Sequence, residues 1–323
     1  MNFKQILKRV DTERFLDTYE LTRAFLGTIF ITMVVLEFVC FASAATITQP
    51  NTKAPIDLIG CRDIEEPGSY RLTSDLSFGS DDEDYCIDIW SDNVILDGQG
   101  HSIRCRDNHQ EDCSYAISAT SSKNITIKNI IIYNIREGTG VELGNVNNAT
   151  ISGIQTSNLN EGIYLGAVNN TLLTGNYFYS GSPDNGWSDC IGMFSTKNVT
   201  VQGNVCQGHN YSIVIGQLNK NLKIYNNYLN SITKEITLYQ TNGSEIYLSI
   251  PKTPGRNVIG GNYIGGNYWA KPNGRGFSQT CSDNNRDGFC DSCLGLGYGL
   301  YDLLPLTNHG PGPIQSLCNV ANK

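Results

Sequence analysis

A short phrase that begins with asparagine recurs through the middle of the chain. Its clear copies start 22–28 residues apart, at Asn124, Asn148, Asn170, Asn198 and Asn221. Within each copy the second and fourth residues are mostly apolar and the third is polar, which is the alternation of a strand with one buried face. A period of this length with a strand-like alternation indicates a solenoid of stacked coils and excludes helical repeats.

A second apolar phrase lies between the copies, at 140–144, 162–166, 190–194 and 212–216, so each repeat holds several short strands. One repeat cannot bury its apolar face alone, but stacked repeats bury a continuous column of Ile, Val and Leu. A β-propeller would need repeats about twice as long. We therefore predict an all-β fold, a right-handed parallel β-helix. Its inward residues include Ile125, Ile127, Ile151, Val199, Val201 and Ile224, and its outward residues include Thr126, Thr150 and Thr200.

The N-terminus has the layout of an export signal. Five basic residues precede an apolar run from Ala24 to Ala44, and the run ends in small residues, so we expect cleavage before Ala45. An uncleaved membrane anchor is the alternative, because the run is about long enough to span a bilayer, although Glu37 disfavours a stable span. We thus predict a signal peptide or anchor helix over 1–44, a β-helix with its N-terminal cap over 45–265, and an Asp- and Cys-rich C-terminal cap over 266–323.

The cysteine content also indicates export. Eleven cysteines are present, and Cys40 lies in the apolar run, which leaves an even number for disulfides in an oxidising compartment. Residues one coil apart lie close in space, so we expect near neighbours to pair. The expected pairs are Cys61 with Cys86, Cys105 with Cys113 and Cys190 with Cys206, followed by a C-terminal knot of Cys281, Cys290, Cys293 and Cys318. Zinc is a weaker interpretation, because only Cys290 and Cys293 form a CxxC and no histidine is near them.

The charge of the chain limits its partners. The net charge is −8 and there is no basic run, which argues against nucleic acid. We expect membrane contact only through the N-terminal segment. Glycosylation sequons fit a surface location; they stand at Asn124, Asn148, Asn169, Asn198, Asn210 and Asn242.

Three passages resemble the NosD-like right-handed β-helix proteins, which are also described as carbohydrate-binding and sugar-hydrolysis folds and are abundant on archaeal cell surfaces. They are the segment 61–76, the repeats, and the pair 266–269 and 302–306. The resemblance implies a secreted or cell-surface protein with a structural or glycan-binding role. It implies a polysaccharide, a cell-envelope glycan or other envelope proteins as partners.

The Asp-rich loop of the C-terminal cap resembles the first part of an EF-hand calcium loop. Oxygen ligands stand at every second residue, with a glycine where the chain turns. The expected ligands of a structural calcium are Asp283, Asn285, Asp287, Phe289 through its carbonyl, and Asp291. The twelfth position is Leu294 instead of a glutamate, so affinity should fall unless Asp302 approaches. A disulfide-held turn without an ion is the alternative.

A second, local resemblance is to the polygalacturonases. In that family aspartates and a histidine on adjacent coils surround a disulfide, and here Asp189, His209 and the pair Cys190 and Cys206 match that pattern, with Glu161 one coil earlier. Glu161 and Asp189 would activate water, as an inverting hydrolase requires. However, Ser188 replaces the expected general acid, and the family's Arg-Ile-Lys is missing.

The sequence therefore favours a binding role over catalysis. Stacking residues for a neutral glycan would be Tyr164, Trp187 and Tyr211. A degenerate or active glycoside hydrolase is the first alternative. A copper accessory role, implied by the NosD-like resemblance, is the second alternative. Copper(I) favours Cys and Met ligands, and Met193 is the only methionine after the apolar run. The histidines are scattered, at His101, His109, His209 and His309.

Overall fold

The computed structural model describes residues 54–79, 84–106, 113–180, 188–241 and 244–312. The described residues belong to one compact unit. Residues 1–53, with the expected cleavage site, lie outside the described residues. Within the described part, no helix is both long and apolar enough to cross a membrane.

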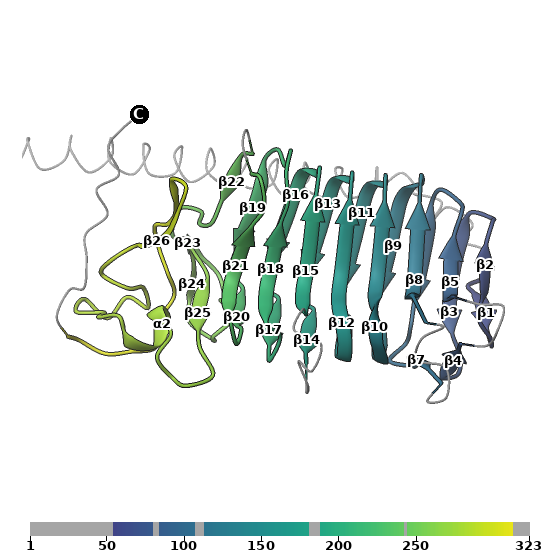
Figure 1. Cartoon of the computed structure of the whole chain (residues 1–323), viewed down its shortest axis with the longest axis horizontal. Coiled ribbons are helices and arrows are strands. Elements are labelled where there is room, and N and C mark those ends of the chain that lie inside the picture. The colour runs from purple at the N-terminus through teal and green to yellow at the C-terminus, as the bar shows by residue number, and fades with distance from the viewer. Residues whose placement is uncertain (1–53, 80–83, 107–112, 181–187, 242–243, 313–323) are drawn as a thin grey trace, which may run out of the picture. The chain divides into compact units, whose positions relative to one another are not determined.

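The described chain is a stack of short parallel strands in two large sheets (Figure 1). The first sheet has the order β1 (Ile56–Leu58), β3 (Gly68–Leu72), β6 (Val94–Asp97), β9 (Lys123–Lys128), β11 (Asn147–Ser152), β13 (Asn169–Thr174), β16 (Lys197–Gln202), β19 (Leu222–Tyr225) and β22 (Ile246–Tyr247). Neighbours in this order are separated by a whole coil in sequence, so the fold is a parallel β-solenoid.

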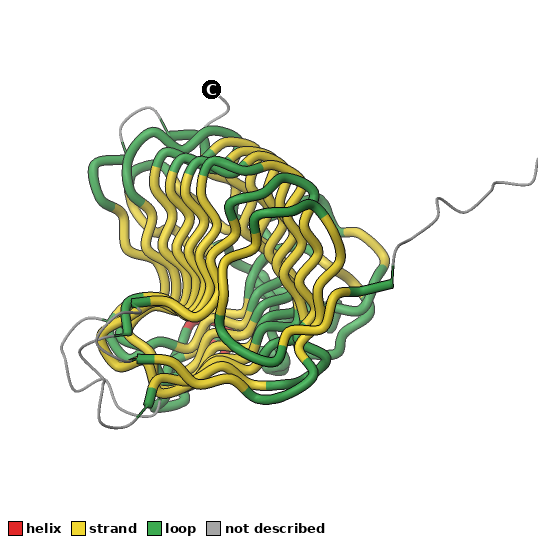
Figure 2. Tube along the Cα trace, turned by 90° about the vertical axis from the view of Figure 1, so that its right-hand side faces the viewer, coloured by secondary structure: helices red, strands yellow, loops and turns green. Residues whose placement is uncertain are grey.

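The second sheet wraps around the rest of each coil. Its main path is β2 (Arg62–Ile64), β5 (Tyr85–Ile89), β8 (Tyr115–Thr120), β10 (Ile131–Gly144), β12 (Gln155–Gly166), β14 (Tyr177–Tyr179), β17 (Val205–Gln207), β20 (Tyr228–Asn230) and β25 (Tyr268–Ala270). Its branches are β4 (Leu76–Phe78), β7 (Ser102–Cys105), β15 (Asp189–Phe194), β18 (Tyr211–Ile215) and β21 (Lys234–Leu238). β10 and β12 are long because each continues from one face of the coil to the next. Figure 2 shows that the stacked strands turn through an inward bend on one side.

The asparagine phrases form the first sheet, and their register explains the core. Ile127 pairs with Ile151, Ile151 with Leu173 and Val201 with Ile224, so each apolar residue stacks on its counterpart one coil away. All six residues predicted to point inward are buried, and Thr126, Thr150 and Thr200 are partly exposed on the outer face. The predicted alternation is therefore confirmed.

An exposed ladder of amides explains why asparagine opens each phrase. Asn124, Asn148, Asn170, Asn198 and Asn221 all have left-handed backbones, with φ between 50° and 62°, which asparagine tolerates better than most residues. The side-chain amide of Asn148 donates to the Oδ1 of Asn124 at 2.8 Å, and Asn198 donates to Asn170 at 3.0 Å. Several sequon asparagines thus have a structural role in this ladder.

A second ladder of asparagines lies inside the molecule, at the turn between the two sheets. Asn176 donates from its side chain to Asn204 at 2.9 Å, Asn204 to Asn227 at 3.0 Å and Asn227 to Asn267 at 3.0 Å. Each side-chain amide also donates to a backbone carbonyl of the preceding coil, such as Leu173 for Asn204. All four asparagines are buried, so the ladder satisfies backbone groups that water does not reach.

The C-terminal cap ends this buried ladder with a carboxylate. Asp302, on β27 (Leu300–Asp302), accepts the backbone N–H of Asn267 at 2.7 Å and the indole N–H of Trp269 at 2.8 Å. A side chain at Gly266 would collide with this carboxylate, which explains the glycine before Asn267. The other cap elements are β26 (Leu294–Gly297), antiparallel to β27, the pair β23 (Thr253–Pro254) and β24 (Tyr263–Ile264), and α2 (Phe277–Thr280).

The structure confirms the predicted near-neighbour disulfides. Their Cα atoms lie 4.5 Å apart for Cys61 and Cys86, 6.0 Å for Cys105 and Cys113, and 6.0 Å for Cys190 and Cys206. In the C-terminal knot Cys281 pairs with Cys290 at 5.6 Å, and Cys293 is also disulfide-bonded. Cys318 lies outside the described residues.

We predict that the buried ladder contributes more to stability than the exposed one. Asn204→Ala removes an amide that serves two neighbouring coils and leaves buried groups unpaired, so the free energy of unfolding should fall by about 3 kcal/mol. Asn148→Gly keeps the left-handed backbone and removes only exposed bonds, so it should cost less than about 1 kcal/mol. Urea unfolding followed by circular dichroism measures both, and equal losses would contradict the interpretation.

Candidate functional site

A line of polar side chains crosses the outer face of the second sheet. Thr139 pairs in register with Glu161, Glu161 with Asp189, and Asp189 with Tyr211, on the successive strands β10, β12, β15 and β18. Because these strands are parallel and in register, residues 22 to 28 positions apart become neighbours about 4.8 Å apart. The two carboxyls predicted from the sequence, Glu161 and Asp189, are therefore brought together.

Glycine at position 192 provides the space in which these two carboxyls meet. A Cβ atom at Gly192 would collide with Glu161 Oε1 and would lie 3.4 Å from Asp189 Oδ2. The other carboxylate oxygen of Glu161 accepts a hydrogen bond from the hydroxyl of Thr139 at 3.1 Å. Asp189 is only 3% exposed although it lies on the outward side of the strand. The pair is thus a fixed, largely desolvated dyad of acids.

Burial and mutual repulsion make this dyad hard to ionise. Burial is the main cause that raises the pKa of Glu161 to about 7, and the charge of Glu142 adds to it while the Thr139 hydrogen bond opposes it. Burial also raises the pKa of Asp189 well above its ordinary value, with the charge of Glu161 as the second cause. Both carboxyls therefore resist ionisation, and the charge of one opposes the ionisation of the other.

Further acids extend the same face toward the N-terminal coils. Asp63 pairs with Asp88, and Ser118 connects Asp88 to Glu142 in register. Burial raises the pKa values of Asp88 and Glu142, and the charge of Asp88 contributes to the shift of Glu142. The outward side of this sheet therefore bears acids on both sides of Ser118.

Tyrosines flank the acids on both sides. Tyr164 pairs with Glu142 and Gly192 in register, and its ring lies 5.8 Å from that of Phe194 in a tilted arrangement. The hydroxyl of Tyr115 donates a hydrogen bond to Glu142. Desolvation raises the pKa of Tyr239, with Tyr211 and the charge of Asp189 as further causes. We call this surface the acidic–tyrosine face. It consists of Asp63, Asp88, Glu142, Glu161, Asp189, Tyr115, Tyr164, Tyr211 and Tyr239.

His209 does not join this face. It is 1% exposed, neither ring nitrogen has a hydrogen-bond partner, and burial alone lowers its pKa to about 4. The catalytic role predicted for His209 together with Asp189 stays a prediction. Trp187 lies outside the described residues.

Sequence reasoning missed Thr139, Glu142, Asp88 and Gly192 as parts of the site. None of them belongs to a short motif, and each becomes significant only because a neighbouring coil places it beside Glu161 or Asp189. An alignment of the apolar phrases of the repeats would have placed these residues beside their neighbours. Val141, Ile163 and Ile191, for example, are equivalent positions of successive repeats.

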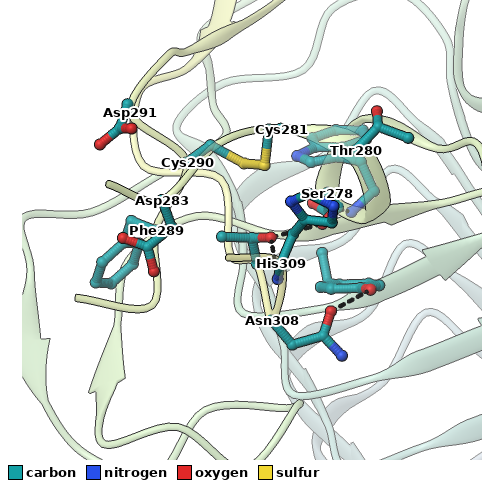
Figure 3. Close-up of a disulfide and its surroundings, with 12 residues drawn as sticks. Ser278, Thr280, Cys281, Asp283, Phe289, Cys290, Asp291, Asn308 and His309 are labelled. Carbon is teal, nitrogen blue, oxygen red and sulfur yellow. Dashed lines mark hydrogen bonds between the residues drawn. A yellow bond between two sulfur atoms is a disulfide. The ribbon is translucent and has the colours of Figure 1, made fainter. Parts of the chain in front are cut away.

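The Asp-rich loop is tied by its own hydrogen bonds. Asp283 accepts the backbone N–H groups of Asp287 and Gly288 at 3.1 and 3.0 Å. Asp291 accepts from the backbone and side chain of Asn284 at 2.9 and 2.7 Å. Figure 3 shows Asp283, Phe289 and Asp291 around the Cys281–Cys290 disulfide.

A lysine from another segment pairs with one carboxylate of this loop. The ammonium of Lys252 lies 3.0 Å from Asp287 Oδ2, 4.6 Å from the ring centroid of Tyr263 and 5.3 Å from that of Phe289. Asp302 does not approach the loop, because its carboxylate is bound to Asn267 and Trp269. In the described residues no group of three or more His, Cys, Asp or Glu side chains is placed to hold a metal. Calcium binding by this loop stays a prediction.

We predict that Glu161 makes the protein less stable as the pH rises. Its pKa is raised in the folded state from 4.5 to about 7. Between these two values the folded protein binds more protons than the unfolded chain. The free energy of unfolding therefore falls as the pH rises through that window. Glu161→Gln keeps an acceptor for Thr139 without a charge. It should raise the free energy of unfolding at pH 8 by roughly 1–2 kcal/mol and have little effect at pH 4.5.

The measurement is urea unfolding at several pH values, with Glu245→Gln as the control. Glu245 is an exposed glutamate that lies 3.5 Å from Lys220, away from the face. An equal gain at pH 4.5 and pH 8 for Glu161→Gln would show that ionisation is not its cause.

Comparison with known proteins places this solenoid in a family. The family model described as periplasmic copper-binding protein (NosD) matches residues 83–274, which is more than half of the chain and covers all the coils that carry Glu142, Glu161 and Asp189. A comparison with curated proteins gives no match. The resemblance predicted from the sequence is confirmed, and the chain belongs to the NosD family of right-handed parallel β-helix proteins.

Proposed function

We propose that this protein is an exported envelope protein that binds a glycan along the acidic–tyrosine face. The observation that carries the proposal is the dyad of Glu161 and Asp189 above Gly192, with Tyr164 and Tyr211 beside it in register. Polyhydroxylated sugars require both hydrogen-bonding groups and flat amphipathic surfaces, and carboxyls next to tyrosine rings supply both. The line of similar residues along the coils suits an extended polymer.

The location is supported by two observations. The family model is described as a periplasmic protein. The described cysteines include four pairs at disulfide distance, and disulfides are typical of proteins outside the cytoplasm. The N-terminal apolar run would supply export or anchoring.

Glycoside hydrolysis is a second candidate, favoured by the protonation of the dyad. A hydrolase needs one protonated and one ionised carboxyl across the scissile bond. Because burial raises the pKa of both carboxyls, one of the two would keep the proton that Ser188 cannot supply, while the other, once ionised, would act as the base.

Copper, which the family description names, does not fit the described residues. Copper prefers thiolate, thioether or imidazole ligands. Eight of the cysteines are paired, Met193 is fully buried in the core, and His209 is buried on its own between β17 and β18. His101 lies 3.5 Å from Asp75 before β7, and His309 lies in the cap. His109 is outside the described residues. We therefore base no function on copper.

We also propose that the Asp-rich loop binds a structural calcium in competition with Lys252. Asp283, Asn285 and Asp287 supply oxygen atoms within one turn, and Lys252 now neutralises Asp287. Calcium should raise the melting temperature of the wild type slightly and that of Lys252→Met more, because the competing ammonium is gone. Asp287→Ala should remove both effects. Melting curves with calcium and with chelator measure this, and no shift in Lys252→Met would contradict the proposal.

A glycan array on the purified protein tests the main proposal, followed by titration of each hit. Tyr164→Ala and Tyr211→Ala should weaken binding at least tenfold, since each removes a ring beside the dyad. Tyr298→Ala is the matched control, because Tyr298 is 85% exposed in the cap and lies outside the face. Binding that is equal in all three variants would place the glycan elsewhere, and an array without hits would overturn the proposal.

Reducing-sugar release on each hit separates binding from hydrolysis. Release that disappears in Glu161→Gln and Asp189→Asn would establish the hydrolase. Binding without release in the wild type would establish a binding protein.

A further inference from the structure

The carboxyl groups of the acidic–tyrosine face follow one another coil by coil. The strands β2, β5, β8, β10, β12 and β15 stack in this order on one face, and all except β8 contribute a carboxyl. These carboxyls are Asp63, Asp88, Glu142, Glu161 and Asp189. Successive parallel strands are about 4.8 Å apart. Asp63, Asp88 and Glu142 lie on one line of register positions, with Ser118 between Asp88 and Glu142. Glu161 and Asp189 are register partners on a second, neighbouring line. Carboxyls on the same line are therefore one or two strand spacings apart.

No cation of the described chain interrupts this line. Apart from other acids, the residues in register with the acids are Ser118, Thr139, Tyr164 and Tyr211, which are all uncharged. Lys234 is the first described cation in these register positions, one coil beyond Tyr211. The acids therefore have other acids or uncharged residues as register neighbours, and none of these neighbours is a lysine or an arginine.

Asp88 shows that the face has an unmet demand for a hydrogen-bond donor. Its side chain is more than nine-tenths buried, and Oδ1 has no hydrogen-bond partner. A buried carboxylate oxygen without a partner is costly, and protein structures seldom contain one without a reason. Asp88 is directed into the same line, because its charge acts on Glu142 two coils away.

We propose that the acidic–tyrosine face selects glycans whose sugar units carry free amino groups, with the ammonium groups against the carboxyls and the sugar rings against the tyrosines. This inference rests on the proposed glycan-binding function and adds the substrate class to it. A protonated amine donates to a carboxylate and offsets its charge, whereas an N-acetyl group offers a neutral amide and a uronate adds repulsion. Carboxyls on several neighbouring coils let more than one amino sugar of the same chain be bound.

Isothermal titration of the full protein at pH 6 with three hexasaccharides tests the inference. The probes are a glucosamine hexamer, an N-acetylglucosamine hexamer and a galacturonate hexamer of equal length. The glucosamine hexamer should bind at least tenfold more tightly than the N-acetylated one, and the galacturonate hexamer should not bind. Raising the salt from 50 to 500 mM should weaken only the glucosamine hexamer, because screening acts on the charged contacts.

Variants separate charge recognition from sugar recognition. Asp88→Asn and Glu142→Gln keep the side-chain shape, and each should weaken the glucosamine hexamer several-fold without affecting the N-acetylated one. Tyr164→Ala should weaken both. Glu245→Gln removes an exposed acid outside the face and should change neither. Circular dichroism melts of all variants show whether each is folded.

The outcomes distinguish this inference from the function on which it depends. Equal binding of the amino and N-acetyl hexamers, lost in Tyr164→Ala, would overturn the charge selectivity and leave glycan binding standing. No binding of any hexamer together with an array without hits would overturn both. Spermine that binds as tightly as the glucosamine hexamer, with no effect of Tyr164→Ala, would show a cation site and overturn the glycan class.

Discussion

The parallel hydrogen bonding between successive coils is the interaction on which the rest of the structure depends. It fixes the register, so that equivalent residues of each repeat stack in lines along the solenoid. Apolar residues in these lines form the core, and polar residues in the outward lines form surfaces. A shift of one residue in any coil would exchange the two, because side chains alternate along a strand.

Asparagine holds this register at two turns. At the exposed turn its tolerance of the left-handed region lets the chain change direction, and its amide links it to the next coil. At the buried turn Asn176, Asn204, Asn227 and Asn267 donate in one direction along the solenoid, and each bond polarises the next. Asp302 is a suitable end for such a chain, because a carboxyl offers acceptors to the last N–H groups. The cap is thereby joined to the coils by polar contacts as well as apolar ones.

The same register creates the acidic–tyrosine face and its unusual electrostatics. Glu161 and Asp189 lie 28 positions apart in sequence, and neither has a charged neighbour within its own motif that would predict a raised pKa. Stacked in adjacent coils over Gly192, they share one desolvated space, and burial outweighs the hydrogen bond from Thr139. A rigid solenoid can keep such acids together because the strand ladder, not the side chains, determines their distance.

The sequence by itself determined the period, the strands, the inward residues and the near-neighbour disulfides, because these depend on local alternation and on residues one coil apart. It also brought out Glu161 and Asp189 through a family pattern. Only the tertiary structure decided that His209 is buried without a hydrogen-bond partner, that Thr139, Glu142 and Asp88 lie on the same face as the two acids, and that Lys252 reaches Asp287. The reason is that coil lengths vary, so the partner of a residue in the neighbouring coil follows from the strand register and cannot be read from a fixed spacing in the sequence.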